Sequence, residues 1–98
     1  MDCFKLLQNN VQSLRKNKTE LTHELHERKI DVAILSKIWA DDINTEYLNI
    51  SNYHKILKPR PNPGGGVGIY LRDVYSYTQL NLSSNELFEV IGITIPKK

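Results

Sequence analysis

The feature that most constrains the fold of this chain is the direct succession of an apolar strand, a helix and a second apolar strand. The first strand is expected at 3–8 (CFKLLQ), and Asn9 and Asn10 are expected to end it because asparagine prefers turns to strands. The second strand is expected at 32–35 (VAIL). Two consecutive strands joined by a helix are parallel neighbours, and the helix covers one face of the sheet that they form.

The connecting helix is expected to begin near Asn17 or Thr19 and to end at Asp31. Asn17 is followed three residues later by Glu20, which resembles the pair of residues that caps a helix start. Three leucines share one stripe of this helix and are expected to face the sheet: Leu14, Leu21 and Leu25.

Three or four further strands are expected after this unit, which makes the fold class α/β. Residues 41–51 are polar and are expected to form a connecting loop, whereas 59–66 (PRPNPGGG) excludes regular structure. The candidate strands are Tyr53–Lys58, Val67–Arg72, Tyr77–Leu82 and Leu87–Ile95. The last is the longest apolar run and is expected to be a central strand. With one helix, one face of such a sheet is expected to be largely uncovered.

Length and composition limit the number of domains and the class of protein. Its 98 residues suffice for one domain, and 40% hydrophobic with 24% charged residues is typical of a folded protein. A net charge of +2 is too small to indicate nucleic-acid binding by itself, and does not exclude it. Cys3 is the only cysteine, which fits a reducing compartment. No secretory leader and no apolar run of roughly 18 residues is present, so an intracellular protein outside the membrane is expected.

Two short motifs resemble known sites but favour plainer interpretations. The sequence HELHE contains His23 and His26, three residues apart, whereas the zinc-protease motif needs histidines four residues apart. A solvated helix face is therefore favoured over a metal site. The segment 64–68 (GGGVG) lacks the lysine of a phosphate-binding loop and precedes a strand rather than a helix, which favours a tight entry into that strand.

Polar residues follow the first two strands. Asn9 and Asn10 come at the end of the first, and Lys37 comes directly after the second. Because these strands are expected to be parallel, their carboxyl ends are neighbours, and ligands bind at such an edge in open α/β sheets. Trp39 lies close by as either a core anchor or a stacking platform, and the core is favoured.

Basic residues near the proline- and glycine-rich segment are candidates for contacts to nucleic-acid phosphates. They are Lys58, Arg60 and Arg72, with Lys55 nearby. Phosphates are contacted mostly by Lys, Arg and backbone N–H groups. Taken alone, these residues fit a simple role in solubility better.

Four segments together resemble one family, in order and in spacing: KLLQNNVQSLRKNKTEL, IDVAILSKIW, NYHKILKPRPNPGGGVGIYLR and LFEVIGITI. The family is the apurinic-type endonuclease domain of non-long-terminal-repeat, jockey-like retrotransposons, within the endonuclease/exonuclease/phosphatase superfamily. The resemblance implies that residues 1–98 are the amino-terminal, incomplete part of a four-layer α/β sandwich. It implies an enzyme that nicks DNA with the help of magnesium (Mg2+), so that the nick primes a reverse transcriptase domain of the same polypeptide.

The resemblance also implies roles for individual residues. Asn10 matches the asparagine of the family's catalytic cluster, and Asn9 stands where tryptophan is usual. Lys37 occupies the position of the metal-binding glutamate, and an ammonium cannot replace a carboxylate as a magnesium ligand. The family's later catalytic residues belong to the second half of the domain. The chain is therefore expected to be inactive.

The resemblance further implies partners and a location. DNA is the expected partner, together with the carboxy-terminal half or the reverse transcriptase domain of a parent polypeptide, and the nucleus is the expected location. Two alternatives remain open at the level of sequence. One is a module that binds nucleic acid without catalysis, and the other is a remnant whose exposed sheet recruits a partner protein.

Overall fold

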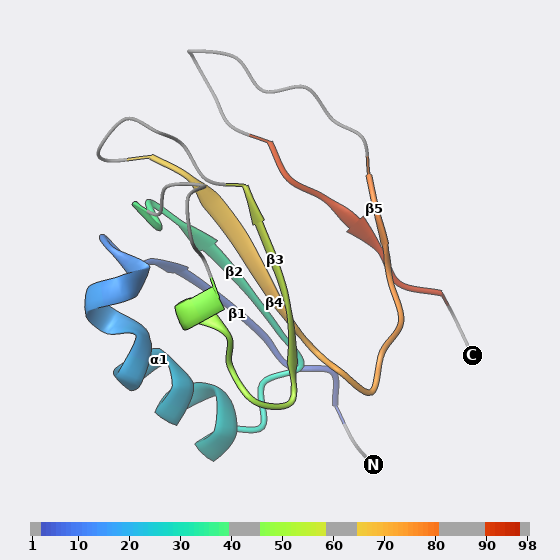
Figure 1. The fold of residues 1–98 in the computed structure, drawn as a ribbon. Helices are drawn as coiled ribbons and strands as arrows, with labels where there is room; N and C mark the ends of the chain where they lie inside the picture. The colour runs from blue at the N-terminus through green and yellow to red at the C-terminus, as the bar shows by residue number, and fades with distance from the viewer. Residues whose placement is uncertain (1–2, 40–45, 59–64, 81–89, 97–98) are drawn as a thin grey trace.

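The expected strand–helix–strand unit is present in the structure, a computed structural model. The structure describes residues 3–39, 46–58, 65–80 and 90–96. Strands β1 (Leu6–Asn10) and β2 (Val32–Ser36) are parallel neighbours. Helix α1 (Leu14–Glu27) joins them and covers one face of their sheet (Figure 1). The prediction of an α/β fold with a βαβ unit is confirmed.

The predicted end of β1 is wrong, because the strand continues through both asparagines. Asn9 pairs with Leu35 and Asn10 pairs with Ser36 in the parallel ladder. The turn preference of asparagine is outweighed here by backbone hydrogen bonds to a neighbouring strand that is itself largely buried.

The predicted start of α1 is also wrong, since the helix begins three residues before Asn17. Ser13 is the N-cap, and its hydroxyl oxygen accepts a hydrogen bond from the backbone N–H of Lys16. Asn17 lies inside the first turn, where its amide donates to the carbonyl oxygens of Val11 at 2.7 Å and Ser13 at 3.1 Å. The helix ends at Glu27, four residues before the predicted Asp31.

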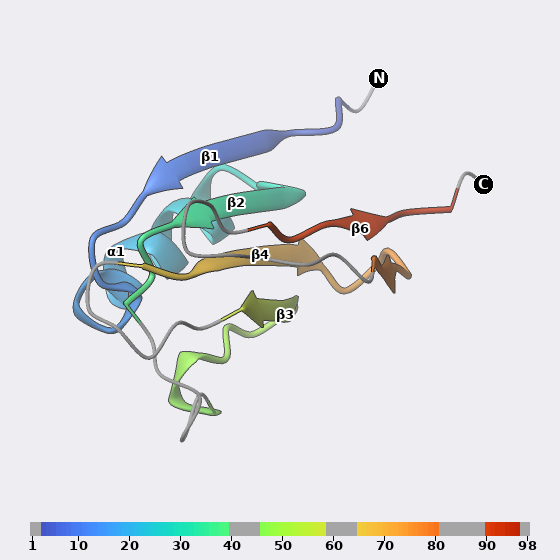
Figure 2. The ribbon, with the colours of Figure 1, turned by 90° about the horizontal axis from the view of Figure 1, so that it is seen from above.

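Two antiparallel strands complete the main sheet. Strands β3 (Tyr53–Lys58) and β4 (Val67–Arg72) have the predicted bounds. The spatial order is β1-β2-β4-β3, so β4 lies between β2 and β3, as the view in Figure 2 shows. Both ladders of β4 are antiparallel, which makes the sheet mixed.

The main core lies between α1 and this sheet. The three predicted leucines of α1 are buried. Their largest partner is Tyr70 of β4, whose hydroxyl donates to the carbonyl oxygen of Leu48 in a short 3₁₀ helix, η1 (Glu46–Leu48). Burial raises the pKa of Tyr70, so the hydroxyl remains a donor. The residues buried in this core are Val11, Leu14, Leu21, Leu25, Ile30, Ala33, Leu35, Ile38, Leu48, Ile50 and Tyr70.

A second, two-stranded sheet packs on the opposite face. It consists of β5 (Thr78–Gln79) and β6 (Ile93–Thr94), which are antiparallel. The side chains of Ile91, Ile93 and Ile95 pack against a cluster formed by Val32, Ile56, Ile69 and Leu71. Figure 1 shows the resulting order of layers, with helix, main sheet and small sheet side by side.

The prediction of a central strand at Leu87–Ile95 is wrong for the residues that the structure describes. Residues 90–96 contribute only β6, which pairs with β5 outside the main sheet, while 81–89 lie outside the described residues. The predicted strand Tyr77–Leu82 is reduced to β5 within its described part.

The prediction of an uncovered sheet face holds only in part. The small sheet covers its centre. Leu6 and Ile34, near the β1 edge, remain 59% and 36% exposed. Among the described residues, no helix has both the length and the apolar character needed to cross a bilayer.

Candidate functional site

The carboxyl ends of β1 and β2 are joined beyond the last ladder residues. Three backbone hydrogen bonds continue the pairing: Val11 N–H to Ser36 O at 3.1 Å, Ser13 N–H to Lys37 O at 3.0 Å, and Leu14 N–H to Ile38 O at 2.8 Å. The start of α1 is thus bonded to the segment that follows β2. The predicted proximity of the two carboxyl ends is confirmed.

The glycine-rich segment that leads into β4 is hydrogen-bonded to the segment that follows β2. The carbonyl oxygens of Gly66 and Gly65 accept hydrogen bonds from the N–H groups of Ile38 at 3.3 Å and Trp39 at 2.9 Å. Gly66 has a φ of 96°, a left-handed conformation that favours glycine. Three chain segments therefore meet here, and we call their meeting place the carboxyl edge: residues 10–14, 36–39 and 65–67.

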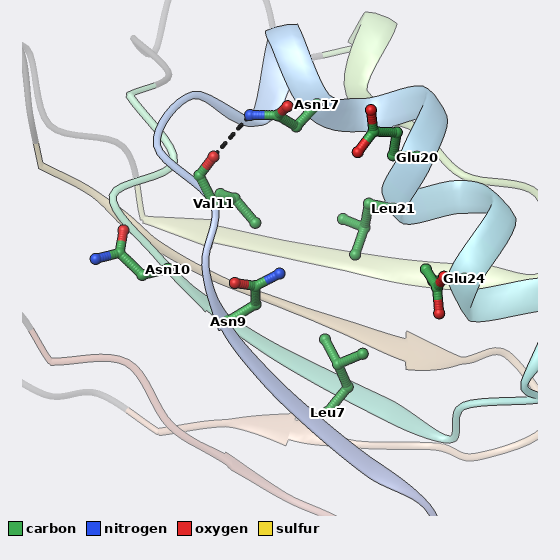
Figure 3. Close-up of a pocket in the computed structure, with 8 residues that line it drawn as sticks. All are labelled: Leu7, Asn9, Asn10, Val11, Asn17, Glu20, Leu21 and Glu24. Carbon is green, nitrogen blue, oxygen red and sulfur yellow. Dashed lines mark hydrogen bonds between the residues drawn. The ribbon is translucent and has the colours of Figure 1, made fainter.

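The carboxyl edge presents polar and aromatic side chains to solvent. Asn10 and Ser36 are exposed ladder partners, and the Asn10 side chain points away from α1 (Figure 3). Lys37 follows them, exposed and with a φ of 53°. Trp39 is 47% exposed, so the prediction of a core tryptophan is wrong. The buried position of this segment is taken by Ile38 instead.

The described residues of the carboxyl edge include no carboxylate. Magnesium requires oxygen ligands, above all carboxylates, whereas the residue that follows Ser36 is the exposed Lys37, which ends in an ammonium. The described residues hold no group of three histidine, cysteine, aspartate or glutamate side chains that could bind a metal. His23 and His26 are exposed, as the plainer interpretation of HELHE predicts, and His26 Nε2 lies 2.9 Å from the carbonyl oxygen of Ser51.

The structure separates the basic residues proposed as phosphate contacts. Lys58, at the end of β3, donates from Nζ to the carbonyl oxygen of Val90 at 3.0 Å and so links β3 to the segment that precedes β6. Arg72 ends β4 at the opposite end of the sheet, beside Tyr53 in the ladder. Arg60 lies outside the described residues.

Sequence reasoning missed the function of Asp31, which is 4% exposed. Its carboxylate accepts hydrogen bonds from Lys5 N–H at 2.7 Å and the Tyr75 hydroxyl at 3.1 Å, and it pairs with Arg72 Nη1 at 3.0 Å. Burial favours the neutral acid, but these hydrogen bonds and the guanidinium charge together hold the pKa of Asp31 below its ordinary value. The only sequence signal of this structural role was the position of an aspartate directly before an apolar strand.

A cavity of about 270 Å³ lies between β1 and α1, as Figure 3 shows. Leu7 and Asn9 line it from the strand, and Glu20, Leu21 and Glu24 line it from the helix. Asn9 is the position at which the family resemblance expects tryptophan. The small amide therefore leaves space where a larger apolar side chain would contact the helix.

Comparison with known proteins supports the fold alone. No protein family model matches the sequence, and no curated protein matches it. The crystal structure of the AP endonuclease LMAP from Leishmania major is similar, with a TM-score of 0.64 and 22% sequence identity. The match covers 89% of this chain and 31% of that one, so the chain spans less than a third of the AP endonuclease. Its mixed α/β arrangement matches part of an AP endonuclease fold.

Proposed function

We propose that residues 1–98 are the amino-terminal part of a retrotransposon endonuclease domain that contacts DNA without magnesium-dependent hydrolysis. The similarity to part of an AP endonuclease fold supports the nuclease-type architecture. The ordered match of four sequence segments supports the retrotransposon origin. The observation that carries the loss of hydrolysis is the exposed Lys37, which directly follows Ser36, the ladder partner of Asn10.

The side chains of the carboxyl edge fit a nucleic-acid strand better than they fit a cation. An exposed ammonium at Lys37 attracts a phosphate, and the hydroxyl of Ser36 and the amide of Asn10 provide neutral donors next to it. The half-exposed indole of Trp39 offers a flat surface on which a base can stack. In this arrangement Asn10 orients the phosphate, and Lys37 neutralises it.

The parent polypeptide proposed here has two further partners. One is the remainder of the endonuclease domain, since the matched part is less than a third of the similar AP endonuclease. The other is a reverse transcriptase domain, for which a nick in DNA supplies the primer. Both follow from the family resemblance, as does a nuclear location.

The test measures the binding of the purified chain to a fluorescein-labelled DNA duplex by anisotropy, over a series of salt concentrations, with either EDTA or magnesium chloride. We expect binding that weakens steeply with salt and that does not depend on magnesium. Lys37→Gln is expected to weaken binding and to reduce the slope of log K against log salt by about 1, as for one lost phosphate contact. Supercoiled plasmid is expected to stay intact.

One result would contradict the proposed loss of hydrolysis, and another would contradict the proposed DNA-binding site. Magnesium-dependent nicking of the plasmid by the wild-type chain would show that Lys37 does not abolish hydrolysis. A salt slope unchanged by Lys37→Gln would show that DNA is bound elsewhere.

A second candidate function rests on the exposed apolar residues beside β1. Phe4 and Leu6 are 53% and 59% exposed, and β1 is an edge strand of the main sheet. An unpaired edge next to apolar side chains favours association with another polypeptide. A monodisperse monomer in multi-angle light scattering would count against this second function.

A further inference from the structure

Two cavities, of about 620 Å³ and about 560 Å³, are both lined by Arg72 at the end of the sheet opposite the carboxyl edge. We call the larger one, of about 620 Å³, the amino-end pocket because its residues precede β1 and β2, end β4 or, as Tyr75 does, follow β4 closely. It is large enough for a small organic ligand. Its lining includes Phe4, Lys5, Lys29, Asp31, Arg72 and Tyr75.

Positive charge dominates the amino-end pocket. Three cationic side chains line it together with one carboxylate. That carboxylate, Asp31, is buried and already accepts hydrogen bonds from Lys5 N–H, Tyr75 and Arg72. Its charge is therefore compensated within the protein, and the excess positive charge faces the cavity.

The cations retain donors that these contacts do not use. Arg72 pairs with Asp31 through Nη1, and a guanidinium has five N–H donors. Lys5 Nζ donates to the carbonyl oxygen of Arg28 at 3.1 Å, which uses one of its three hydrogens. Lys29 is exposed and lines both cavities. Cationic donors arranged around a concave surface suit the several oxygens of a phosphate.

An aromatic pair stands beside these cations. The rings of Phe4 and Tyr75 meet edge to face, with their centroids 5.4 Å apart. Tyr75 is held by its bond to Asp31, and Phe4 is 53% exposed. The exposed face of an aromatic ring binds planar heterocycles by stacking.

We propose that the amino-end pocket binds a nucleotide. Its phosphate contacts Lys5, Lys29 and Arg72, and its base lies against Phe4. The shared chemistry of a phosphate joined to a planar base can come from a free mononucleotide or from the terminal nucleotide of a single strand. The inference goes beyond the proposed function and does not depend on it, because the two sites lie at opposite ends of the strands.

The competing explanation is that these cations only stabilise the end of α1. Lys5 Nζ donates to the carbonyl oxygen of Arg28, the C-cap of α1, and positive charge is favourable at a helix carboxyl end. That role requires no ligand, and it does not account for the exposed part of the Phe4 ring, which otherwise contacts Tyr75. Ligand titration separates the two explanations.

The experiment is a titration of the isotope-labelled chain followed by amide chemical shifts. The probes are AMP, adenosine, inorganic phosphate and a 5′-phosphorylated oligothymidylate. We expect saturable shifts at Lys5, Lys29 and Tyr75 with AMP, the oligonucleotide or both, and much weaker effects of adenosine or phosphate alone. A response to AMP assigns the pocket to free nucleotides, and a response to the oligonucleotide alone assigns it to strand ends.

Variants test the residues without disturbing the Asp31 contacts. Lys29→Glu is expected to weaken binding about tenfold or more, because a cation at the phosphate is reversed. Lys16→Glu makes the same change at an exposed position in the first turn of α1 and is expected to leave binding unchanged. The proposal is overturned if neither nucleotide probe shifts these amides, if inorganic phosphate binds as tightly as AMP, or if Lys29→Glu and Lys16→Glu behave alike. Loss of duplex binding in Lys37→Gln has no bearing on these outcomes.

Discussion

At the scale of single residues, the side chain at position 37 determines what the carboxyl edge can bind. The backbone there is fixed by hydrogen bonds to the start of α1 and to the glycine-rich segment. A substitution at Lys37 therefore changes the chemistry of the edge without changing its shape. The exposed ammonium favours anions and opposes cations at the same place.

Exchange of this one charge is expected to create weak metal affinity. Lys37→Glu places a carboxylate beside Asn10 and Ser36, so Mn²⁺, a paramagnetic substitute for Mg²⁺, is expected to bind there. The measurement is the broadening of amide signals at residues 10 and 36–38. Lys37→Gln has nearly the same shape without charge and is the control. Equal broadening in the wild-type chain would contradict the assignment of Lys37 to a lost metal position.

A second prediction at this scale concerns the cavity beneath Asn9. Asn9→Leu places apolar atoms against Leu7 and Leu21 and is expected to raise the free energy of unfolding by about 1 kcal/mol. Gln8→Leu, on the face opposite α1, meets no such cavity and is expected to change stability by less than about 0.5 kcal/mol. Thermal unfolding measures both. An equal gain in the two variants would mean that general hydrophobicity, not cavity filling, is responsible.

The sequence predicted some of these residues and missed others for physical reasons. The spacing of two apolar strands was sufficient to place Asn10 and Lys37 at one edge. The prediction of a buried Trp39 was wrong, because the φ of 53° at Lys37 interrupts strand alternation there and Ile38 is buried instead. Asp31 was missed because its partners lie far away in the sequence, at Lys5, Arg72 and Tyr75.

At the scale of the elements, the start of helix α1 depends on the side chain of Asn17, which donates hydrogen bonds where a helix cap would accept them. Asn17 donates its amide hydrogens to the carbonyl oxygens of Val11 and Ser13, and so fastens the turn between β1 and α1 to the helix. Ser13, not Asn17, caps the helix, because its hydroxyl oxygen accepts the N–H of Lys16. The amide of Asn17 instead links the end of β1 to α1.

Asn17→Asp is expected to destabilise the protein even though acidic residues usually favour the first turn of a helix. The carboxylate cannot donate, and it faces three backbone carbonyl oxygens, so a loss of about 1–2 kcal/mol in the free energy of unfolding is expected. Lys16→Asp adds negative charge in the same turn without facing those oxygens and is the control. Urea unfolding decides the matter, and a stabilised Asn17→Asp variant would show that the helix dipole outweighs the lost bonds.

The bounds of β3 and β4 were predicted correctly, whereas the apolar run that contains β6 was assigned to the wrong sheet. Strands β3 and β4 alternate between an α1-facing and an opposite-facing set, and their bounds were predicted correctly. The apolar run containing β6 has no such alternation that distinguishes a central strand from a second layer. Its isoleucines contact the main sheet from outside rather than joining it.

At the scale of the whole molecule, Asp31 joins parts that are distant in the sequence. Its carboxylate holds the residue before β1, the last residue of β4 and the segment that leads to β5. The main sheet and the chain that forms the small sheet therefore depend on the same charge. Protonation of Asp31 is expected to weaken all of these contacts together.

The stability of the chain is accordingly expected to depend on Asp31 in acid. The pKa of Asp31 is lowered in the folded state, so its contribution is complete above the ordinary aspartate pKa of about 3.9 and is lost as pH falls through the lower folded value. Asp31→Asn is expected to cost about 2 kcal/mol near neutral pH and progressively less below about pH 4. Denaturant unfolding over a pH series measures this. Asp73→Asn, at an exposed side chain, is the control, and parallel pH curves for wild type and Asp31→Asn would refute the assignment.

The place of β4 between β2 and β3 has a consequence for synthesis on the ribosome. The chain emerges amino end first, so β1, α1, β2 and β3 are all made before Val67–Arg72. Until then β3 has no partner strand, and the inner edge of β2 is open. The main sheet can close only after β4 has left the exit tunnel. Nascent chains arrested before Val67 expose this unpaired edge, and they are the species that chaperones are expected to hold.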